Sequence, residues 1–330
     1  MRTITLEEHF VTAGFLKAIA PHVRPAPPAM QQTQGRLLDL GADRIAAMDQ
    51  GEVDVQVLSL AAMGLDKLDA ATATPLAHDI NDELASAVLA HPDRFAGFAA
   101  LALKNPPSAA KELERCITKL GFKGAMLDGT TGGEFLDQPK FLPVFEAAQS
   151  LGVPIYLHPA PPPQTVQSAY YSNLPGDRGY LLSIAGWGWH AETGLHLLRL
   201  ILSGLFDRLP DLKIIVGHMG EGVPYALARS SQVLSHATPH LPRSVADYFH
   251  RNIHVTTSGY FTVPPFQCAL DVVGIGRLLY SIDYPFSPTT QGRDFLNALP
   301  LNQEDLAKFT HLNAEELLKL SSGGRSTVSE

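Results

Sequence analysis

The chain has 330 residues, of which 18% are charged and 45% hydrophobic, and its formal net charge is −8. This composition excludes a disordered chain and is typical of a compact globule with a large core. The acidic balance, without a basic stripe, argues against nucleic acid as a partner. Cys116 and Cys268 lie far apart in the chain, which argues against a disulfide scaffold and a thiolate metal site.

Two features of the sequence bear on where the protein is found. Glu7 and Glu8 interrupt the apolar stretch that a signal peptide requires. The longest apolar helical stretch, residues 195–206, contains Arg199 and is too short to span a bilayer. We therefore expect no membrane partner and a cytoplasmic, reducing location.

Short strand-like runs alternate with helical stretches along the whole chain. The expected strands cover residues 2–6, 54–60, 94–101, 122–127, 153–158, 212–218, 252–256 and 277–283. The expected helices cover residues 14–20, 38–50, 75–90, 107–120, 139–151, 190–206, 220–236 and 265–273, and two or three more close the chain. Eight strand–helix units without a break in composition predict an α/β fold, a single (β/α)₈ barrel domain over residues 1–320. The first strand is not followed by GxGxxG, which argues against a dinucleotide-binding sheet.

Three segments fall outside this regular alternation. Residues 21–35 form an arm rich in Pro and Gln, too polar for the core, which we interpret as a lid or a subunit contact. Residues 159–189 form a long connection rich in Pro, Gly and Tyr, and loops of that length are usually functional. Residues 321–330 are typical of a flexible C-terminal tail.

The first strand ends in a pair of residues suited to binding a metal ion. Residues two apart on a strand point to the same side, so Glu7 and His9 would present a carboxylate and an imidazole together. A Glu-x-His pair also arises by chance. The interpretation therefore depends on what the later strands carry.

Three later strands end in residues of the same chemistry. His158, His218 and Asp283 stand at the ends of the fifth, sixth and eighth expected strands. Barrel enzymes carry their sites at the C-terminal ends of the strands, so these side chains would meet Glu7 and His9 there. Imidazole and carboxylate ligands together suit a divalent ion, and Zn²⁺, Mn²⁺ and Mg²⁺ all remain open.

Several longer motifs occur in a distinctive order and spacing. They are LEEHF (6–10), HPDRFAGF (91–98), YLHP (156–159), SGLFD (203–207), GHMGE (217–221), PY (224–225), Arg229 and SIDYPF (281–286). With these motifs the chain resembles the amidohydrolase superfamily, in the branch of the aminocarboxymuconate semialdehyde, γ-resorcylate and 2,3-dihydroxybenzoate decarboxylases. The resemblance extends from residue 3 to about residue 320.

The resemblance implies a metal centre and assigns its ligands. One divalent ion would be held by four side chains, Glu7, His9, His158 and Asp283. His218 would then face the substrate rather than the metal. Members with two metals carry a modified lysine at the end of the fourth strand, where this chain reads Met126-Leu127-Asp128. We therefore expect a single ion.

The activity that the resemblance implies is non-oxidative decarboxylation of a hydroxylated aromatic or related unsaturated carboxylic acid. Loss of CO₂ from an arene requires protonation of the carbon that bears the carboxylate. Asp283 could relay that proton, and His218, oriented by Glu221, could bind the carboxylate or shuttle the proton. The same metal ligands could instead activate a water, so a hydrolase of a lactone or amide is the alternative. A non-catalytic binding barrel is a third interpretation.

Candidates for substrate binding come from one helix face and two aromatic residues. Glu221, Tyr225 and Arg229 recur at four-residue steps and would share a helix face. Arg229 could bind a substrate carboxylate, or it could pair with Glu221 or with a neighbouring chain. Phe286 and Phe10 could wall an aromatic ring, although core packing explains each of them as well. The remaining histidines, His190 included, are interpreted as surface or structural residues.

Two loops depart from the pattern of the characterised decarboxylases. Those enzymes tend to carry a Pro after the second strand and an Arg soon after the fifth, where this chain reads AAMG (61–64) and PAPPP (159–163). The substrate, a small-molecule carboxylic acid, is therefore not specified further. The polar arm at residues 21–35 leads us to expect a homo-oligomer, a dimer or a tetramer.

Overall fold

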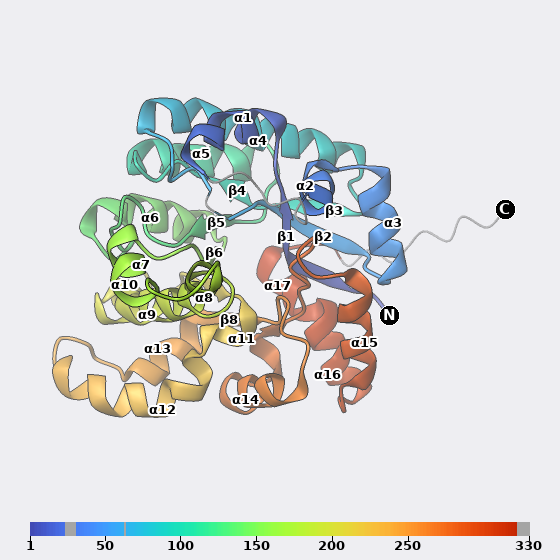
Figure 1. The fold of residues 1–330 in the computed structure, drawn as a ribbon. Helices are drawn as coiled ribbons and strands as arrows, with labels where there is room; N and C mark the ends of the chain where they lie inside the picture. Colours follow the sequence, from blue (N-terminus) through green and yellow to red (C-terminus); the bar gives the residue numbers. More distant parts are fainter. Residues whose placement is uncertain (24–30, 63, 322–330) are drawn as a thin grey trace.

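The computed structural model describes residues 1–23, 31–62 and 64–321 and confirms the alternation of strands and helices (Figure 1). Its strands are β1 (Ile4–Phe10), β2 (Val55–Leu60), β3 (Phe95–Gly97), β4 (Ala99–Ala100), β5 (Ala125–Asp128), β6 (Ile155–His158), β7 (Ile214–Val216), β8 (Ile253–Thr256) and β9 (Leu278–Leu279). Its longer helices are α1 (Ala13–Ile19), α2 (Gln31–Leu38), α3 (Ala42–Gln50), α4 (Ala70–Ala90), α5 (Pro106–Thr118), α6 (Leu142–Leu151), α9 (Gly188–Leu202), α12 (Val223–Leu234), α13 (Val245–Asn252), α14 (Val263–Val273) and α15 (Thr289–Ala298). Shorter helices and helical turns are η1 (Ala20–His22), η3 (Pro139–Phe141), α7 (Gln164–Tyr170), α8 (Arg178–Ser183), α10 (Leu205–Arg208), α11 (His218–Glu221), η4 (Ser235–Ala237), η5 (Ile275–Arg277), α16 (Gln303–Ala307), η6 (Lys308–Leu312) and α17 (Asn313–Leu318).

All the strand pairs are parallel, and they follow the chain in order as β1-β2-β3 and β4-β5-β6-β7-β8-β9. β3 and β4 act as one strand that changes partner at Phe98, whose N–H donates to Leu58 O at 2.9 Å. At the other edge, a parallel bridge joins Glu8 to Tyr284, and His9 N–H donates to Tyr284 O at 2.7 Å. These contacts bring the two sheets into the eight-stranded (β/α)₈ barrel that the sequence predicts.

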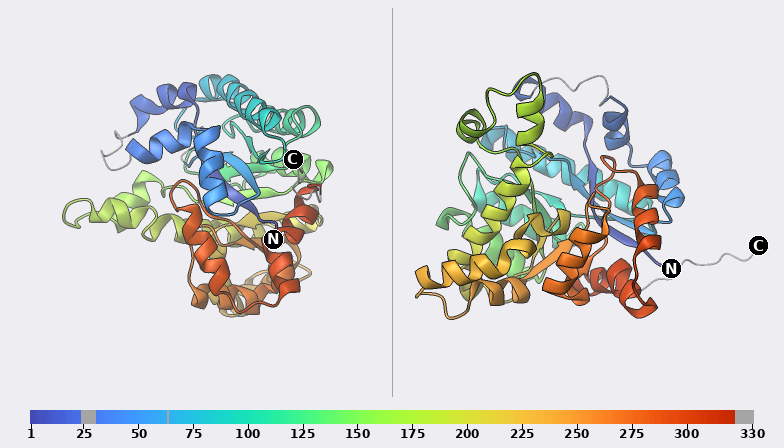
Figure 2. Two further views of the ribbon diagram at one scale, coloured as in Figure 1. Left: turned by 90° about the vertical axis from the view of Figure 1, so that its right-hand side faces the viewer. Right: turned by 60° about the horizontal axis from the view of Figure 1, so that its bottom comes forward.

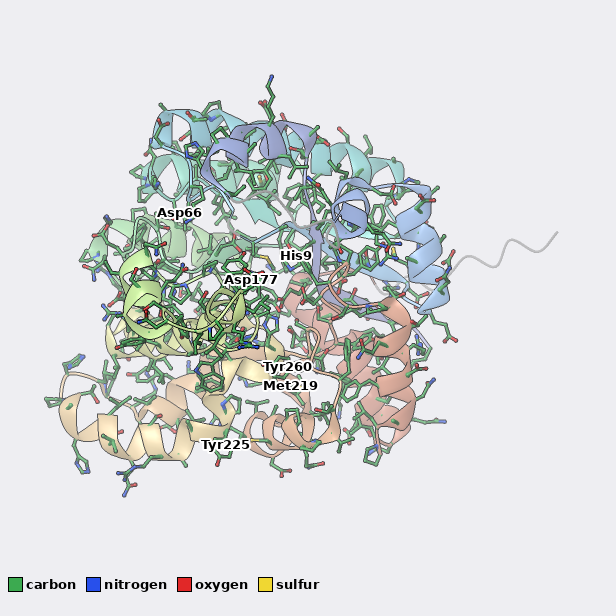
Figure 3. The ribbon with its side chains drawn as sticks, in the orientation of Figure 1. His9, Asp66, Asp177, Met219, Tyr225 and Tyr260 are labelled. Atoms are coloured by element: carbon green, nitrogen blue, oxygen red, sulfur yellow. The ribbon has the colours of Figure 1, made fainter. Side chains whose placement is uncertain are left out.

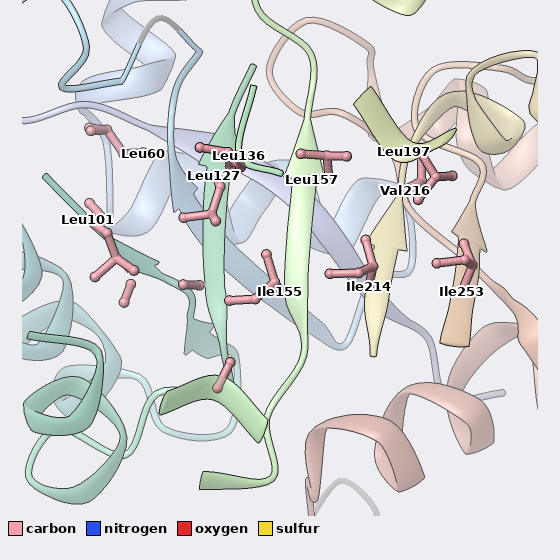
Figure 4. Close-up of a cluster of buried hydrophobic side chains, with 14 of the residues drawn as sticks. Leu60, Leu101, Leu127, Leu136, Ile155, Leu157, Leu197, Ile214, Val216 and Ile253 are labelled. Atoms are coloured by element: carbon pink, nitrogen blue, oxygen red, sulfur yellow. The ribbon is translucent and has the colours of Figure 1, made fainter. Parts of the chain in front are cut away.

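The barrel has two apolar layers. Inside it, alternate strand residues pack against one another and against two side chains of α17; they are Ile4, Leu6, Val55, Val57, Ala96, Phe98, Met126, Tyr156, Ile215 and Leu279, with Ala314 and Leu318. Between the strands and the surrounding helices lies a second cluster, which includes Leu127, Leu157 and Val216 (Figure 4). Burial on both faces explains why the strands read as apolar runs rather than alternating ones.

A bulge in β1 turns polar side chains into this interior. The pairing of β1 with β2 shifts between Thr5 and Glu8, so strict alternation fails there. Leu6 belongs to the apolar interior cluster, while the next residue, Glu7, contacts Tyr156, which is also an interior residue. The bulge thus re-aims the strand so that Glu7 and His9 follow Leu6 into the barrel.

Element boundaries differ from the sequence-based expectation where side-chain caps decide them. α4 begins at Ala70 rather than at Pro75, because the Asp69 carboxylate accepts the Thr72 N–H at 2.8 Å and caps the helix. The connection over residues 159–189 contains α7 and α8, which project from one face of the barrel (Figure 2).

The arm and the tail are covered only in part. Helical turns occupy both ends of the arm predicted at 21–35, while residues 24–30 and the tail beyond Ser321 lie outside the described residues. No helix among the described residues has the length and apolarity needed to cross a bilayer.

His196 on α9 makes stability depend on pH. It is 1% exposed, its Nε2 accepts the Leu136 N–H at 3.0 Å, and burial with the neighbouring Arg199 lowers its pKa to about 3. An unfolded chain protonates histidine near pH 6.5, so the stability present above that pH is lost as the pH falls toward 3. We expect H196Q, which keeps an acceptor but does not titrate, to lose less stability than wild type between pH 7.5 and 5.5, by about 1.4 kcal/mol. Urea unfolding at the two pH values measures this, and equal losses would contradict it.

Candidate active site

Four side chains from distant parts of the chain converge at the C-terminal end of the barrel. Glu7 and His9 come from β1, His158 ends β6, and Asp283 follows β9. His158 Nε2 lies 3.1 Å from Glu7 Oε1, and His9 Nε2 lies 3.3 Å from Asp283 Oδ1. The rings of His9 and His158 meet edge to face with centroids 4.8 Å apart. The structure therefore brings together the four residues that the sequence nominates as metal ligands, with His9 at the centre of Figure 3.

The atoms of this cluster are those that a metal ion would need. Ligand atoms of Glu7, His9 and His158 lie within 4.8 Å of one another, and all three side chains are buried. Among the described residues, Glu7 Oε1 and His9 Nε2 are buried and make no well-formed hydrogen bond, although His158 Nε2 and Asp283 Oδ1 lie within 3.3 Å of them. Buried polar atoms are rarely left unpaired, and two imidazoles with carboxylates form a suitable donor set for a divalent ion. The residues present fit a metal.

The second oxygen of Glu7 is fixed by hydroxyl groups from two strands. Tyr156 Oη and Ser258 Oγ both donate to Glu7 Oε2, the latter at 2.6 Å, and Thr256 Oγ1 lies 2.7 Å from Tyr156 Oη. At Gly217, a Cβ would collide with the Glu7 carboxylate, so only glycine lets the end of β7 pass this close. These contacts hold one oxygen of Glu7 and leave the other for the cluster.

The charges around Glu7 favour its ionised form. Burial alone raises the pKa of Glu7, but the nearby His218, His158 and His9 outweigh burial and hold that pKa well below its usual range. Burial likewise opposes protonation of His158, yet Glu7 and Asp128 together raise its pKa to about 10. The protonated imidazoles thus compensate the buried charge of Glu7, and a divalent cation bound there would take the place of those protons.

Glu8 has a structural role that the sequence did not suggest. Its carboxylate accepts the N–H groups of Ile282 at 2.9 Å and Tyr284 at 3.1 Å, and burial raises its pKa to about 8. Ile282 and Tyr284 flank Asp283 in the chain. Glu8 therefore fastens β1 to the segment that carries Asp283 and sets the position of that residue.

His218, Glu221 and His190 form a hydrogen-bonded chain beside the cluster. His218 Nδ1 lies 2.8 Å from Glu221 Oε1, and His190 Nδ1 lies 2.6 Å from Glu221 Oε2. His218 Nε2 points toward the cluster, 3.6 Å from Glu7 Oε1 and 3.9 Å from Asp283 Oδ2. Burial opposes protonation of His218, but Glu7 and Glu221 raise its pKa well above the usual value.

This hydrogen-bonded group places His190 beside the cluster, where the sequence predicted a surface or structural histidine, and shows that it is not a surface residue. His190 is 7% exposed, and Trp189 Nε1 donates to its Nε2 at 3.1 Å. The ligand atoms of His190, His218 and Glu221 also lie within 4.8 Å of one another. Both oxygens of Glu221 are, however, already used by the two imidazoles. The Glu7 cluster is therefore the better metal site of the two.

Several site residues have strained backbone conformations. Positive φ values occur at His218 (49°), Glu221 (56°) and Asp283 (69°). Residues other than glycine rarely adopt positive φ values, and such backbone strain persists where the surrounding structure enforces it. The strain supports a functional role for these three residues.

The structure does not bring every nominated residue into the cluster. Phe10 follows His9 on β1, points to the other side and is fully buried in the core. Arg229 lies on an exposed face of α12, where its Nη1 donates to Gln232 Oε1 at 3.3 Å. Tyr225, on the same helix, is 88% exposed and lies far from His9 in Figure 3. Phe286 is 45% exposed, and its ring centroid is 5.7 Å from that of His9.

Two residues that the sequence did not single out complete the surroundings. Tyr260 is 37% exposed, and its ring centroid lies 5.7 Å from that of His218. Asp128, at the end of β5, lies 3.0 Å from His158 Nδ1 and also lines a cavity of about 450 Å³ between the loops after β5 and β6. Asp128 could have been found from its strand-end position, whereas Tyr260 carries no signal in the sequence.

The fold and the donor set together define a metal-dependent barrel enzyme. The chain belongs to the amidohydrolase family, whose family model matches residues 19–320. It is 37% identical to the γ-resorcylate decarboxylase of Polaromonas sp. over 329 residues, which cover 96% of this chain and 98% of the relative. The resemblance to the decarboxylase branch of this superfamily is thereby confirmed.

Solved structures agree with this assignment. The 5-carboxyvanillate decarboxylase from Sphingomonas paucimobilis has a TM-score of 0.90 and 34% identity, with 97% of this chain and 99% of that chain covered. The dihydroxybenzoic acid decarboxylase from Polaromonas sp. has a TM-score of 0.88 and 36% identity, with 97% of each chain covered. That structure contains manganese and the inhibitor 2-nitroresorcinol.

Asp128 provides a test of the metal site. Its carboxylate orients the His158 imidazole, and loss of such a partner typically weakens metal affinity or activity about 10–100-fold. We expect D128N to bind Mn²⁺ more weakly by that factor, as measured by titration of the metal-free protein. The exposed Asp93→Asn is the matched control and should bind as wild type does. Unchanged affinity in D128N would contradict the assigned role.

Proposed function

We propose that this protein is a metal-dependent, non-oxidative decarboxylase of a hydroxylated aromatic carboxylic acid, with Glu7, His9, His158 and Asp283 around one divalent ion. The observation that carries the proposal is the position of Asp283. Its carboxylate faces His9 on one side, at 3.3 Å, and His218 on the other, at 3.9 Å. Its side chain is 18% exposed, whereas those of Glu7 and His9 are fully buried.

Substrate binding uses the metal ion and the aromatic rings at the mouth of the site. When bound, a divalent ion such as Mn²⁺ supplies positive charge that can hold a carboxylate together with its ortho hydroxyl oxygen. The half-exposed ring of Phe286 stands beside His9, and that of Tyr260 stands beside His218. An aromatic substrate between these rings would be held flat against the carboxylate of Asp283.

Asp283 is the group placed to move the proton. Decarboxylation forms a C–H bond at the carbon that bears the carboxylate and then breaks the C–C bond, releasing CO₂. Asp283, once protonated, donates that proton, and solvent restores it through the exposed edge of the site. His218, held by Glu221 and His190, stays directed at Asp283 and at the departing carboxylate.

Replacement of Asp283 tests this role. General acid catalysis typically contributes about 10²–10⁴-fold, so we expect D283N to reduce kcat by about that factor. The assay is CO₂ release from a panel of ortho-hydroxybenzoates by the Mn²⁺-loaded protein. The exposed Asp294→Asn, on α15, is the control that should leave the rate unchanged.

The isotope content of the product separates decarboxylation from the hydrolase alternative. In D₂O, decarboxylation places one deuterium on the ring carbon that carried the carboxylate. In H₂¹⁸O, a hydrolase places solvent oxygen in its product. Turnover of a lactone or amide with ¹⁸O incorporation, and none of the hydroxybenzoate panel, would contradict the proposal.

We also propose that the protein is a homo-oligomer. Large apolar side chains are exposed on and around the projecting helices α7 and α8, namely Tyr170 (76%), Leu181 (56%) and Trp187 (62%). Exposed apolar surface of this kind typically marks a protein–protein contact. The exposed Arg229 is consistent with a contact to a neighbouring chain, one of the alternatives left open by the sequence.

Light scattering coupled to size exclusion tests this association. We expect a mass of at least two chains for the wild type and a lower one for L181S, because the substitution removes apolar contact area. Leu89 on α4 is 81% exposed and lies outside the projecting helices, so L89S is the matched control. A wild type of single-chain mass would refute the proposal.

We place the protein in the cytoplasm. Both cysteines are free, and Cys116 is buried. Free thiols are typical of reducing compartments.

A further inference from the structure

A second polar cavity lies at the opposite end of the barrel. It has a volume of about 620 Å³ and is lined by residues that precede or begin β6, β7, β8 and β9, together with residues of α17. Lys213 directly precedes β7, His254 is the second residue of β8, and Arg277 directly precedes β9. The metal ligands stand where these strands end, so the cavity is separate from the active site.

Two side chains that line this cavity, Lys213 and Arg277, are cationic. Lys213 and Arg277 form no ion pair within 4.0 Å in the part of the chain that the structure describes. Within residues 1–23, 31–62 and 64–321, Lys213 Nζ donates to one group, the backbone carbonyl of Arg251, at 3.2 Å. Two carboxylates also line the cavity, Asp211 and Glu316, and both are exposed. Burial and Arg277 lower the pKa of Lys213, and Asp211 only partly offsets this effect.

His254 is the third basic side chain and the most buried of the three. It is 9% exposed, and neither ring nitrogen has a hydrogen-bond partner among the described residues. Burial, with Arg277 and Lys213 close by, lowers its pKa to about 3, so the ring is neutral and carries one N–H donor. A buried polar nitrogen without a partner, such as Nδ1 of this ring, costs stability unless a ligand satisfies it.

We propose that this cavity binds a small oxyanion, the phosphate or carboxylate group of a small molecule, through Lys213, His254 and Arg277. A guanidinium offers two parallel N–H donors to such a group, an ammonium offers a compact charge, and the imidazole offers one further donor. The N-terminal end of a barrel usually serves stability, and mutually repelling cations with an unpaired imidazole do not stabilise it. The site involves neither the metal nor Asp283, so the inference does not rest on the proposed function.

Histidine NMR on the full-length, Mn²⁺-free protein tests the site directly. Labelled imidazole signals are titrated with inorganic phosphate, and separately with acetate, at fixed ionic strength; the signal missing in H254Q assigns His254. We expect a saturable shift of His254 with at least one of the two anions, and the tighter anion identifies the group that the site prefers. We expect R277Q to weaken that binding at least about tenfold, because it removes the bidentate charged donor.

Controls distinguish a built site from general attraction of anions. Arg208→Gln removes one exposed charge on α10, outside the cavity, and should leave the anion-binding isotherm of His254 unchanged. Urea unfolding of R277Q tests whether this variant is folded. If it is not, K213Q takes its place in the binding measurement. D283N should bind phosphate as wild type does, which separates this site from the active site. Absence of a saturable His254 shift with either anion, or equal isotherms for folded R277Q and wild type, would overturn the proposal.

Discussion

A buried carboxylate is the constraint on which the rest of this structure depends. Glu7 has no exposed surface, and an ionised group so placed is tolerated only when opposite charge and hydrogen bonds compensate it. One of its oxygens accepts hydrogen bonds from Tyr156 and Ser258. The other lies between the imidazoles of His158 and His218. A divalent cation bound there would take over the compensation from protons on the imidazoles, so metal binding would release protons.

The geometry of the first strand of the barrel, β1, positions the side chains of this cluster. The bulge in β1 sends consecutive residues, Leu6 and Glu7, into the interior, which a regular strand cannot do. Glu8 then binds the backbone on both sides of Asp283. One short stretch of β1 thus supplies two of the proposed metal ligands and also fixes a third, which explains why the strained conformation of Asp283 can persist.

The sequence predicts those features that follow from periodicity and from strand ends. Glu7, His9, His158 and Asp283 could be grouped because parallel strands in a barrel end at one face. His190 could not be recognised, since it belongs to a helix whose approach to Glu221 depends on the path of the preceding loop. Phe10 was nominated by residue type and Arg229 by its four-residue spacing from Tyr225, and the structure places the first in the core and the second on an exposed helix face.

The two ends of the barrel carry polar groups for different reasons. At the C-terminal end, acids and imidazoles are matched in charge around one position, as metal chemistry requires. At the N-terminal end, Lys213, Arg277 and His254 line a cavity, and the carboxylates of Asp211 and Glu316 beside them form no ion pair with them among the described residues. Strands β6 to β9 connect the two ends, and apolar side chains inside the barrel, such as Ile215 and Leu279, separate the two polar regions.

The central claim is that one divalent ion lies among Glu7, His9, His158 and Asp283. The most direct measurement is a crystal structure of the Mn²⁺-loaded protein, with anomalous diffraction data to locate the metal. The account predicts a single strong peak within coordination distance, about 2.0–2.3 Å, of Glu7 Oε1 and His9 Nε2. A peak among His190, His218 and Glu221 instead, or no peak in crystals of the loaded protein, would contradict it.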